Sequence, residues 1–258
     1  MKNKLKHLVP VLLVLATITG SLSACELKPK AQQKVSKQGF YFDTIIQITL
    51  YGTTDEKYID DCFDMAKKYE NMLSNTVSYS EVSKINDAAG KEYVTVSDDT
   101  LELIKKGIEY GDGRFDITIG KLSDLWNFSE IAENTDSKDN EVDASVVPSD
   151  AQIQSELSHV NYRNIQINGN DVMLTDSKAK LDLGGIAKGF IADKMKAYLQ
   201  SKRITSGIIN LGGNVLTVGE KSDGSDYTVG IQKPFDESGE PICTVKVKDK
   251  SVVTSGIY

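Results

Sequence analysis

The chain has 258 residues, a formal net charge of −7 and an ordinary hydrophobic share of 40%. This length allows one large domain or two small ones, and the acidic excess argues against nucleic acid as a partner, because that partner needs a basic surface. With only two histidines, His7 and His159, a metal would have to be held by oxygen ligands, which favours a hard cation such as Mg²⁺. Cys62 and Cys243 are expected to be buried free thiols.

Residues 1–24 are predicted to be a lipoprotein signal peptide. Lysines precede an apolar run at 8–18, which is too short for a comfortable membrane span, and small residues lead up to Cys25. An ordinary secretory peptide, cut near Ala24, is the alternative. A lipidated Cys25 would anchor the protein to the outer, extracytoplasmic face of the cell membrane. Residues 25–39, polar and rich in lysine, would then form a flexible tether.

The next part of the chain carries one strand pattern followed by helix patterns. Residues 40–51 alternate with β-branched side chains and predict a strand, and residues 55–73 place apolar residues at helical spacing. Residues 80–86 predict a short helix or turn. Residues 97–110 predict a further helix, for which Ser97 is a suitable N-cap.

The second half of the chain mixes strand and helix patterns without strict alternation. The predicted elements are a helix at 149–157, strands within 162–183 with a hairpin turn around Gly169, a helix at 186–202, and strands at 227–232 and 244–248. This order favours one α+β domain over residues 40–258, with mixed sheets and flanking helices.

Two glycine pairs carry the clearest functional pattern. Within residues 181–193 a strand-like run ends in Gly184-Gly185, a helix pattern follows, and Asp182 and Lys188 stand on either side. Glycines let backbone groups approach a ligand closely, and a helix N-terminus suits phosphate. Residues 208–214 repeat the arrangement with a second glycine pair. The pattern indicates a site for a phosphate-bearing small molecule, together with a metal ion.

Each candidate residue also has a plainer interpretation. Asp182 could stabilise the turn as a cap, or it could bind a ligand or accept a proton. Gly185 could offer its backbone carbonyl to a cation. Lys188 near a helix start opposes the helix dipole, which favours a ligand-facing role. Asp116 and Thr118, two apart on an extended segment, would project onto one face, either toward a ligand or as solvated strand residues.

These segments, in this order, resemble the ApbE family of flavin transferases. The matching segments are Phe115–Gly120 running into Leu122–Phe128, then Asp182–Gly189, Asn210–Asn214, Gly230–Pro234 and Thr254–Gly256. The resemblance implies an ApbE-like flavin transferase fold and the activity of a FAD:protein FMN transferase. Such an enzyme uses Mg²⁺ and FAD to attach FMN to a threonine hydroxyl of a target flavoprotein, and it releases AMP.

The resemblance also implies a set of site residues. Asp182 and Lys188 would contact FAD, with Asp182 as the catalytic candidate, and Gly185 would offer its main-chain carbonyl to Mg²⁺. Further pocket residues implied by the matching segments are Asp116, Ile117 and Thr118. Phe42 stands where relatives have a methionine. Thr76 stands where many have a tyrosine, and it lacks a ring on which a flavin could stack.

The resemblance finally bears on partners and on completeness. The acceptor would be a flavoprotein of a membrane redox complex or of an extracellular electron-transfer chain. Relatives continue beyond the position of Tyr258 to further Mg²⁺ ligands, so the C-terminal part is expected to be missing and the chain alone to be weakly active or inactive.

Two other functions are compatible with the same residues. A FAD pyrophosphatase would use water in place of the protein hydroxyl and yield FMN and AMP. A non-catalytic lipoprotein could bind flavin for a membrane partner.

Overall fold

The computed structural model describes residues 33–127, 147–234 and 239–255, which form an α+β fold as predicted. The main sheet has five strands in the order β1-β2-β6-β7-β10, and every neighbouring pair is antiparallel. Its strands are β1 (Lys34–Tyr41), β2 (Thr44–Tyr51), β6 (Ser206–Leu211), β7 (Asn214–Gly219) and β10 (Ser251–Val253).

Two smaller sheets accompany it. The three-stranded sheet has the order β3-β5-β4, and the two-stranded sheet is the pair β8 and β9. Their strands are β3 (Val94–Thr95), β4 (Ile165–Asn168), β5 (Asp171–Leu174), β8 (Tyr227–Gln232) and β9 (Pro241–Val247). The hairpin of β4 and β5 turns at Gly169, which has a φ of 62°, and this confirms the turn predicted there.

The helices of the described residues form most of the remainder. They are α2 (Lys57–Leu73), α3 (Glu81–Asp87), α4 (Asp98–Gly111), α5 (Gly120–Asp124), α7 (Asp150–Leu157), the 3₁₀ turn η2 (Tyr162–Asn164) and α8 (Gly184–Ser201). The Ser97 side chain caps α4 by accepting a hydrogen bond from the Thr100 N–H, as predicted. No helix among the described residues is both long and apolar enough to cross a membrane.

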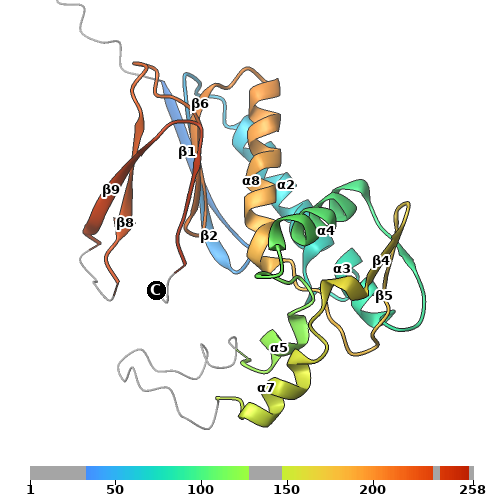
Figure 1. The fold of residues 1–258 in the computed structure, drawn as a ribbon. Helices are drawn as coiled ribbons and strands as arrows, with labels where there is room; N and C mark the ends of the chain where they lie inside the picture. Colours follow the sequence, from blue (N-terminus) through green and yellow to red (C-terminus); the bar gives the residue numbers. More distant parts are fainter. Residues whose placement is uncertain (1–32, 128–146, 235–238, 256–258) are drawn as a thin grey trace, which may run out of the picture. The chain divides into compact units, whose positions relative to one another are not determined.

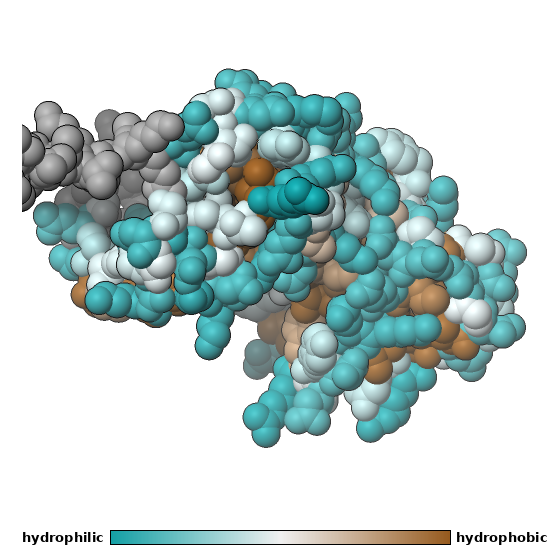
Figure 2. Space-filling view, turned by 90° about the horizontal axis from the view of Figure 1, so that it is seen from above, coloured by the Kyte–Doolittle hydropathy of each residue, from teal (hydrophilic) through white to brown (hydrophobic). Residues whose placement is uncertain are grey.

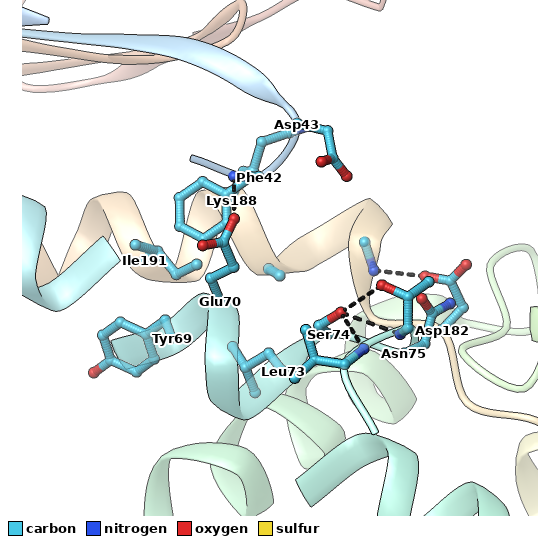
Figure 3. A pocket seen from close by; sticks show the side chains of 14 residues that line it. Phe42, Asp43, Tyr69, Glu70, Leu73, Ser74, Asn75, Asp182, Lys188 and Ile191 are labelled. Atoms are coloured by element: carbon cyan, nitrogen blue, oxygen red, sulfur yellow. Dashed lines mark hydrogen bonds between the residues drawn. The ribbon is translucent and has the colours of Figure 1, made fainter. Parts of the chain in front are cut away.

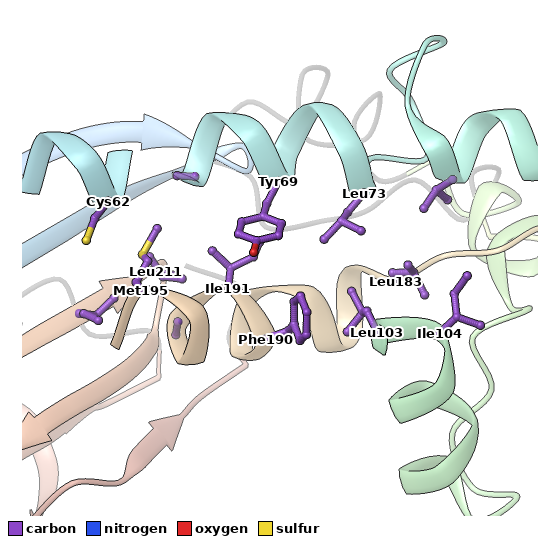
Figure 4. Close-up of a cluster of buried hydrophobic side chains, with 14 of the residues drawn as sticks. Cys62, Tyr69, Leu73, Leu103, Ile104, Leu183, Phe190, Ile191, Met195 and Leu211 are labelled. Carbon is purple, nitrogen blue, oxygen red and sulfur yellow. The ribbon is translucent and has the colours of Figure 1, made fainter. Parts of the chain in front are cut away.

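Helices α2 and α8 pack against one face of the five-stranded sheet, and the hairpin of β8 and β9 lies on the other side (Figure 1). Alternate residues of β2, such as Ile46 and Ile48, are fully buried under the helices. Figure 4 shows the helix–helix part of this core, where Tyr69 of α2 meets Phe190 of α8 edge to face at 6.0 Å between ring centroids. This packing fixes the start of α8, which carries Lys188 and directly follows Asp182.

Three details differ from the sequence-based expectations. Strand β1 begins at Lys34, inside the segment predicted to be a tether, and its residues alternate between exposed and half-buried. An edge strand of this kind needs few apolar residues, so its polar composition concealed it. Helix α8 begins at Gly184, two residues earlier than predicted. Cys62 is buried and Cys243 is exposed, and both are free thiols, so the burial predicted for Cys243 was wrong.

The described surface is largely polar. In Figure 2, hydrophilic residues cover most of the face seen from above, and hydrophobic residues are grouped in a few separate places. Among the large apolar side chains, Phe40 of β1 and Ile45 of β2 are exposed and stand opposite each other in the strand register. They place an apolar cross-strand pair beside the turn at residues 42–43.

The β6–β7 turn needs glycine at residue 212. Gly212 has a φ of 61°, and a Cβ there would lie 2.5 Å from the Thr44 side chain. We expect Gly212→Ala to lower the free energy of unfolding by about 2–4 kcal/mol, because the left-handed backbone and the overpacking both cost stability. Urea denaturation would measure the loss.

Gly224→Ala provides the matched control for that measurement. Gly224 has a φ of 80°, but no heavy atom lies within 4 Å of the position that a Cβ would take there. The substitution therefore carries the backbone cost alone, about 1–2 kcal/mol. Equal losses for the two variants would show that the contact with Thr44 does not constrain the turn.

Candidate functional site

One pocket brings together four of the residues predicted from the sequence. It has a volume of about 280 Å³ and is lined by the β1–β2 turn, the end of α2 with the loop that follows, and the start of α8. Phe42, Thr76, Asp182 and Lys188 all line it, although they come from three separate parts of the sequence; Figure 3 labels Phe42, Asp182 and Lys188. The pocket therefore lies where three distant segments meet.

The β1–β2 turn forms one wall in a strained conformation. Phe42 and Asp43 have φ values of 57° and 56°, and two consecutive non-glycine residues in the left-handed region are costly. The Glu70 Oε1 atom, on α2, accepts a hydrogen bond from the Phe42 N–H at 2.7 Å. This bond ties the turn to the helix and holds Phe42 at the pocket wall (Figure 3).

The loop after α2 forms a second wall. The Ser74 Oγ atom accepts hydrogen bonds from the N–H groups of Thr76 and Val77, each at 3.1 Å, and lies 2.9 Å from the Thr76 Oγ1 atom. These bonds fold the chain back after the helix ends at Leu73. They present a hydroxyl, rather than an aromatic ring, at the position of Thr76.

Asp182 controls the start of α8. Its Oδ1 atom accepts a hydrogen bond from the Gly184 N–H at 2.8 Å, which is the Asx-turn geometry that carboxylate and amide side chains share. No side-chain bond caps the helix at Leu183, the N-cap residue. The helix N-terminus, with its partial positive charge, is therefore next to the pocket, and Asp182 has a structural role whatever its chemical role.

The two glycine pairs serve different purposes. Gly184 and Gly185 are the first two residues of α8 and have ordinary helical φ values, whereas Gly212 and Gly213 have φ values of 61° and 86° in the β6–β7 turn. A Cβ at Gly185 would lie 2.9 Å from the Phe115 ring, so close packing, not backbone freedom, requires glycine there. Gly185 lies in the first turn of α8, beside the pocket lining but outside it.

Asp116, Ile117 and Thr118 lie outside this pocket. Asp116 Oδ1 accepts hydrogen bonds from the Thr118 N–H and Oγ1–H at 2.8 and 2.7 Å, and Asp116 Oδ2 accepts one from the Tyr162 N–H at 2.8 Å. Ile117 and Thr118 are almost fully buried. In the structure these residues hold the chain around residue 162, and their predicted contact with FAD stays a prediction. Cys25 lies outside the described residues.

The pocket carries more negative than positive charge. Three carboxylates, those of Asp43, Glu70 and Asp182, line it together with one ammonium group, that of Lys188. Lys188 forms no ion pair with another described residue. Tyr69 also lines the pocket, and burial, reinforced by the nearby Asp99, raises its pKa to about 12, so its hydroxyl stays protonated at neutral pH.

The polar groups that line the pocket offer oxygen atoms as possible metal ligands, apart from the Lys188 ammonium and the Asn75 amide nitrogen. Within the described part of the chain, no three His, Cys, Asp or Glu side chains converge on a point that could hold a metal ion by themselves. Such a lining suits a hard cation such as Mg²⁺, provided that main-chain or ligand oxygens complete its coordination.

Sequence reasoning missed Asp43 and Glu70. Glu70 lies on the polar face of α2, and nothing in the sequence around it distinguishes it from other acidic residues of helices. The turn at Phe42 and Asp43 lacks the Asn-Gly or Asp-Gly pair that marks such hairpins. The one available sequence signal for this turn was a short break at residues 42–43 in the side-chain alternation that runs from Lys34 to Tyr51.

The model of the ApbE family matches residues 42–258, and the chain belongs to that family. The FAD:protein FMN transferase of Klebsiella pneumoniae (strain 342) is 34% identical over 218 residues, which cover 83% of this chain and 63% of the relative. The FAD:protein FMN transferase of Treponema pallidum (strain Nichols) is 25% identical, over 95% of this chain and 70% of the relative.

A solved structure agrees with the family assignment. The crystal structure of the ApbE protein of Thermotoga maritima MSB8 superposes with a TM-score of 0.76 at 29% identity, covering 87% of this chain and 71% of that one. The chain thus spans about two thirds of the length of these relatives.

Proposed function

We propose that this chain takes part in the transfer of FMN from FAD to a hydroxyl of an acceptor flavoprotein, with release of AMP. The observation that carries the proposal is the pocket in which Phe42, Thr76, Asp182 and Lys188 meet. The family assignment supports it, since the similar proteins of Klebsiella and Treponema are named FAD:protein FMN transferases.

The residues of the pocket suit a diphosphate ester. The N-terminus of α8 and the Lys188 ammonium would attract its phosphates, and Asp182 stands beside them as the group that could accept the proton of the attacking threonine hydroxyl. In phosphoryl transfer, positioning and charge stabilisation supply most of the rate. The site lies at the junction of two packed helices, and this rigid location provides the positioning.

The charge of the pocket supports a requirement for Mg²⁺. Three carboxylates would repel an anionic diphosphate, and one lysine does not neutralise them. A divalent cation bound to phosphate oxygens and to the Gly185 carbonyl would supply the missing positive charge and polarise the phosphoryl group.

We also propose that Cys25 carries a lipid that anchors the protein at the outer face of the membrane, where the acceptor would belong to a membrane redox complex or an extracellular electron-transfer chain. The basic, apolar and small-residue order of residues 1–25 supports this proposal. Mass spectrometry of the membrane fraction tests it: the mature chain should begin at Cys25 with added acyl mass. A mature chain that lacks Cys25, or that carries no acyl mass, would contradict it.

The activity can be tested by incubating the full-length gene product with FAD, Mg²⁺ and a candidate acceptor flavoprotein. Flavin fluorescence bound covalently to the acceptor, together with AMP in equal amount, is the expected result. AMP without bound flavin would indicate a FAD pyrophosphatase instead. Neither product, with FAD still bound, would leave a flavin-binding protein and overturn the proposal. EDTA is the control for the cation.

A further inference from the structure

The short segment that ends at Asp182, residues 180–182, belongs to none of the three described sheets. Lys180 forms one isolated bridge with Ile119, and the next three residues have no strand or helix structure before α8 begins at Gly184. A full strand is fixed by a ladder of backbone bonds to its neighbour, and this segment has only a fragment of one. The contacts that hold it therefore decide where the Asp182 carboxylate lies.

The side chain of Asn86 takes the place of a neighbouring strand at Leu181. The Leu181 N–H donates to Asn86 Oδ1 at 2.7 Å, and Asn86 Nδ2 donates to Leu181 O at 3.1 Å. A carboxamide offers the same donor and acceptor as a peptide group, so one side chain satisfies both backbone groups of Leu181. The two residues are 95 apart in the sequence, so the fold, and not a local turn, creates this pair of bonds.

Both ends of the pair are held in the core. Asn86 lies in the last turn of α3, and Val82 and Ile85 of the same helix are almost fully buried. The Leu181 side chain is fully buried as well. Without the Asn86 amide, the Leu181 N–H and C=O would lose their partner in an interior position, and unsatisfied groups of this kind are costly. The segment would then shift to find other partners.

The backbone on either side of Leu181 is tied to a different part of the chain. The Gly120 N–H donates to Lys180 O at 2.9 Å, and the Asp182 N–H donates to Ile117 O at 2.8 Å. Of the three residues 180–182, Leu181 is thus the one whose partner is a side chain. A substitution can remove that partner and leave the two backbone bonds in place.

We propose that Asn86 is a positioning residue for the transfer reaction, because its amide fixes the Leu181 peptide and thereby sets the place of the Asp182 carboxylate. The inference rests on the proposed function, in which Asp182 accepts the proton of the attacking hydroxyl. Asn86 does not line the pocket around Asp182; with Lys180 it lines a neighbouring one. Its effect on the reaction is therefore exerted through the backbone of the next residue along from Leu181.

The first test is Asn86→Ala in the full-length gene product, which removes both bonds to Leu181. We expect kcat for FMN transfer to fall about 10- to 100-fold, because a small misplacement of a reacting group costs this much. KM for FAD should change much less, because the start of α8 and Lys188 attract the diphosphate and Asn86 bonds to neither. Steady-state rates with FAD, Mg²⁺ and acceptor separate the two constants.

A double-mutant cycle with Asp182→Asn shows whether Asn86 acts through Asp182. In that background we expect Asn86→Ala to cost little further rate, because the positioned carboxylate has already been removed and residues that act as a unit are not additive. If the two losses multiply, Asn86 acts by another route, such as direct contact with a ligand in the neighbouring pocket, and the inference is overturned.

Asn170→Ala is the matched control. The Asn170 Nδ2 atom donates to Val96 O at 3.2 Å and to Asp98 Oδ1 at 2.6 Å, so this amide also ties distant backbone together, but Asn170 does not line the pocket around Asp182. We expect both alanine variants to have a lower Tm. At a temperature well below either Tm, only Asn86→Ala should lose kcat.

The outcomes separate the inference from the function on which it rests. If the full-length wild type transfers no FMN, both fail. If the wild type is active and Asn86→Ala loses stability but keeps its kcat, as Asn170→Ala does, the inference alone fails and the bonds to Leu181 serve stability only. If Asn86→Ala does not fold, Asn86→Asp decides, because it keeps an acceptor for the Leu181 N–H and loses the donor to Leu181 O. A lowered kcat that disappears in the cycle with Asp182→Asn supports the inference, and an unchanged kcat refutes it.

Discussion

Asp182→Asn is expected to lower the rate of FMN transfer by about 100-fold or more, the loss typical when a general base or acid is removed, with the protein still folded. Asparagine keeps an Oδ1 atom that can accept the Gly184 N–H, as the carboxylate does at 2.8 Å. The start of α8 is therefore preserved, and the variant loses only the charge and the capacity to accept a proton.

The chain offers a closely matched control in Asp176→Asn. The Asp176 Oδ1 atom accepts the Lys178 N–H at 2.8 Å, the same two-residue turn, while its Oδ2 atom lies 2.7 Å from His159 Nδ1. Asp176 does not line the pocket, so we expect near wild-type transfer. Rates measured with FAD, Mg²⁺ and acceptor, together with Tm, compare the two. Full activity of Asp182→Asn would reduce Asp182 to a turn stabiliser.

Lys188→Gln is expected to weaken FAD binding about 10- to 100-fold, because a hydrogen bond to a charged group contributes roughly 1.5–3 kcal/mol. Lys188 has no ion-pair partner among the described residues, so its removal leaves no carboxylate of the protein without its partner. The effect of the substitution should therefore appear in the affinity for FAD. Quenching of flavin fluorescence on titration with the protein measures the dissociation constant.

Lys196→Gln is the control for this variant. Lys196 lies on the same helix, two turns further on, and its Nζ atom pairs with Asp249 Oδ1 at 2.8 Å. We expect this variant to bind FAD as the wild type does. If Lys188→Gln also binds FAD normally, the diphosphate does not lie at the start of α8, and the orientation proposed for the substrate is wrong.

The longer helices were predicted well because their signals are local, whereas the short helix α5 was not predicted. Ser97 caps α4 and apolar residues recur along α2 at helical spacing, and both features are determined by residues within a few turns. Strand β1 was missed before Phe40 because an edge strand is stabilised by its neighbour, β2, and not by its own hydrophobicity. The start of α8 was placed two residues late because glycine ordinarily ends helices, whereas here the bond from Gly184 to Asp182 begins one.

The site was predicted only where a motif or the family resemblance marks it. Asp182 and Lys188 stand in a recognisable segment, but Glu70 entered the pocket through its bond to Phe42, a contact between residues 28 apart that no local pattern encodes. Asp116 and Thr118 were predicted on an extended segment, but residues 117 and 118 form a turn, in which Asp116 Oδ1 accepts the Thr118 N–H and Oγ1–H. Their remaining bonds reach residues 161 and 162, far along the chain.

The strand order has a consequence for how the molecule reaches its native state. Strand β2 pairs with β1 through a tight hairpin, but its other partner is β6, where Ile46 meets Leu211. The chain between them includes α2, α4 and α8, so the central pairing must close a very long loop, and such non-local contacts make folding slow. Helices can form early, but the pocket, which needs both the hairpin tip at Phe42 and the start of α8, is assembled only when that closure is complete. Binding competence should accordingly be among the last properties to appear during refolding.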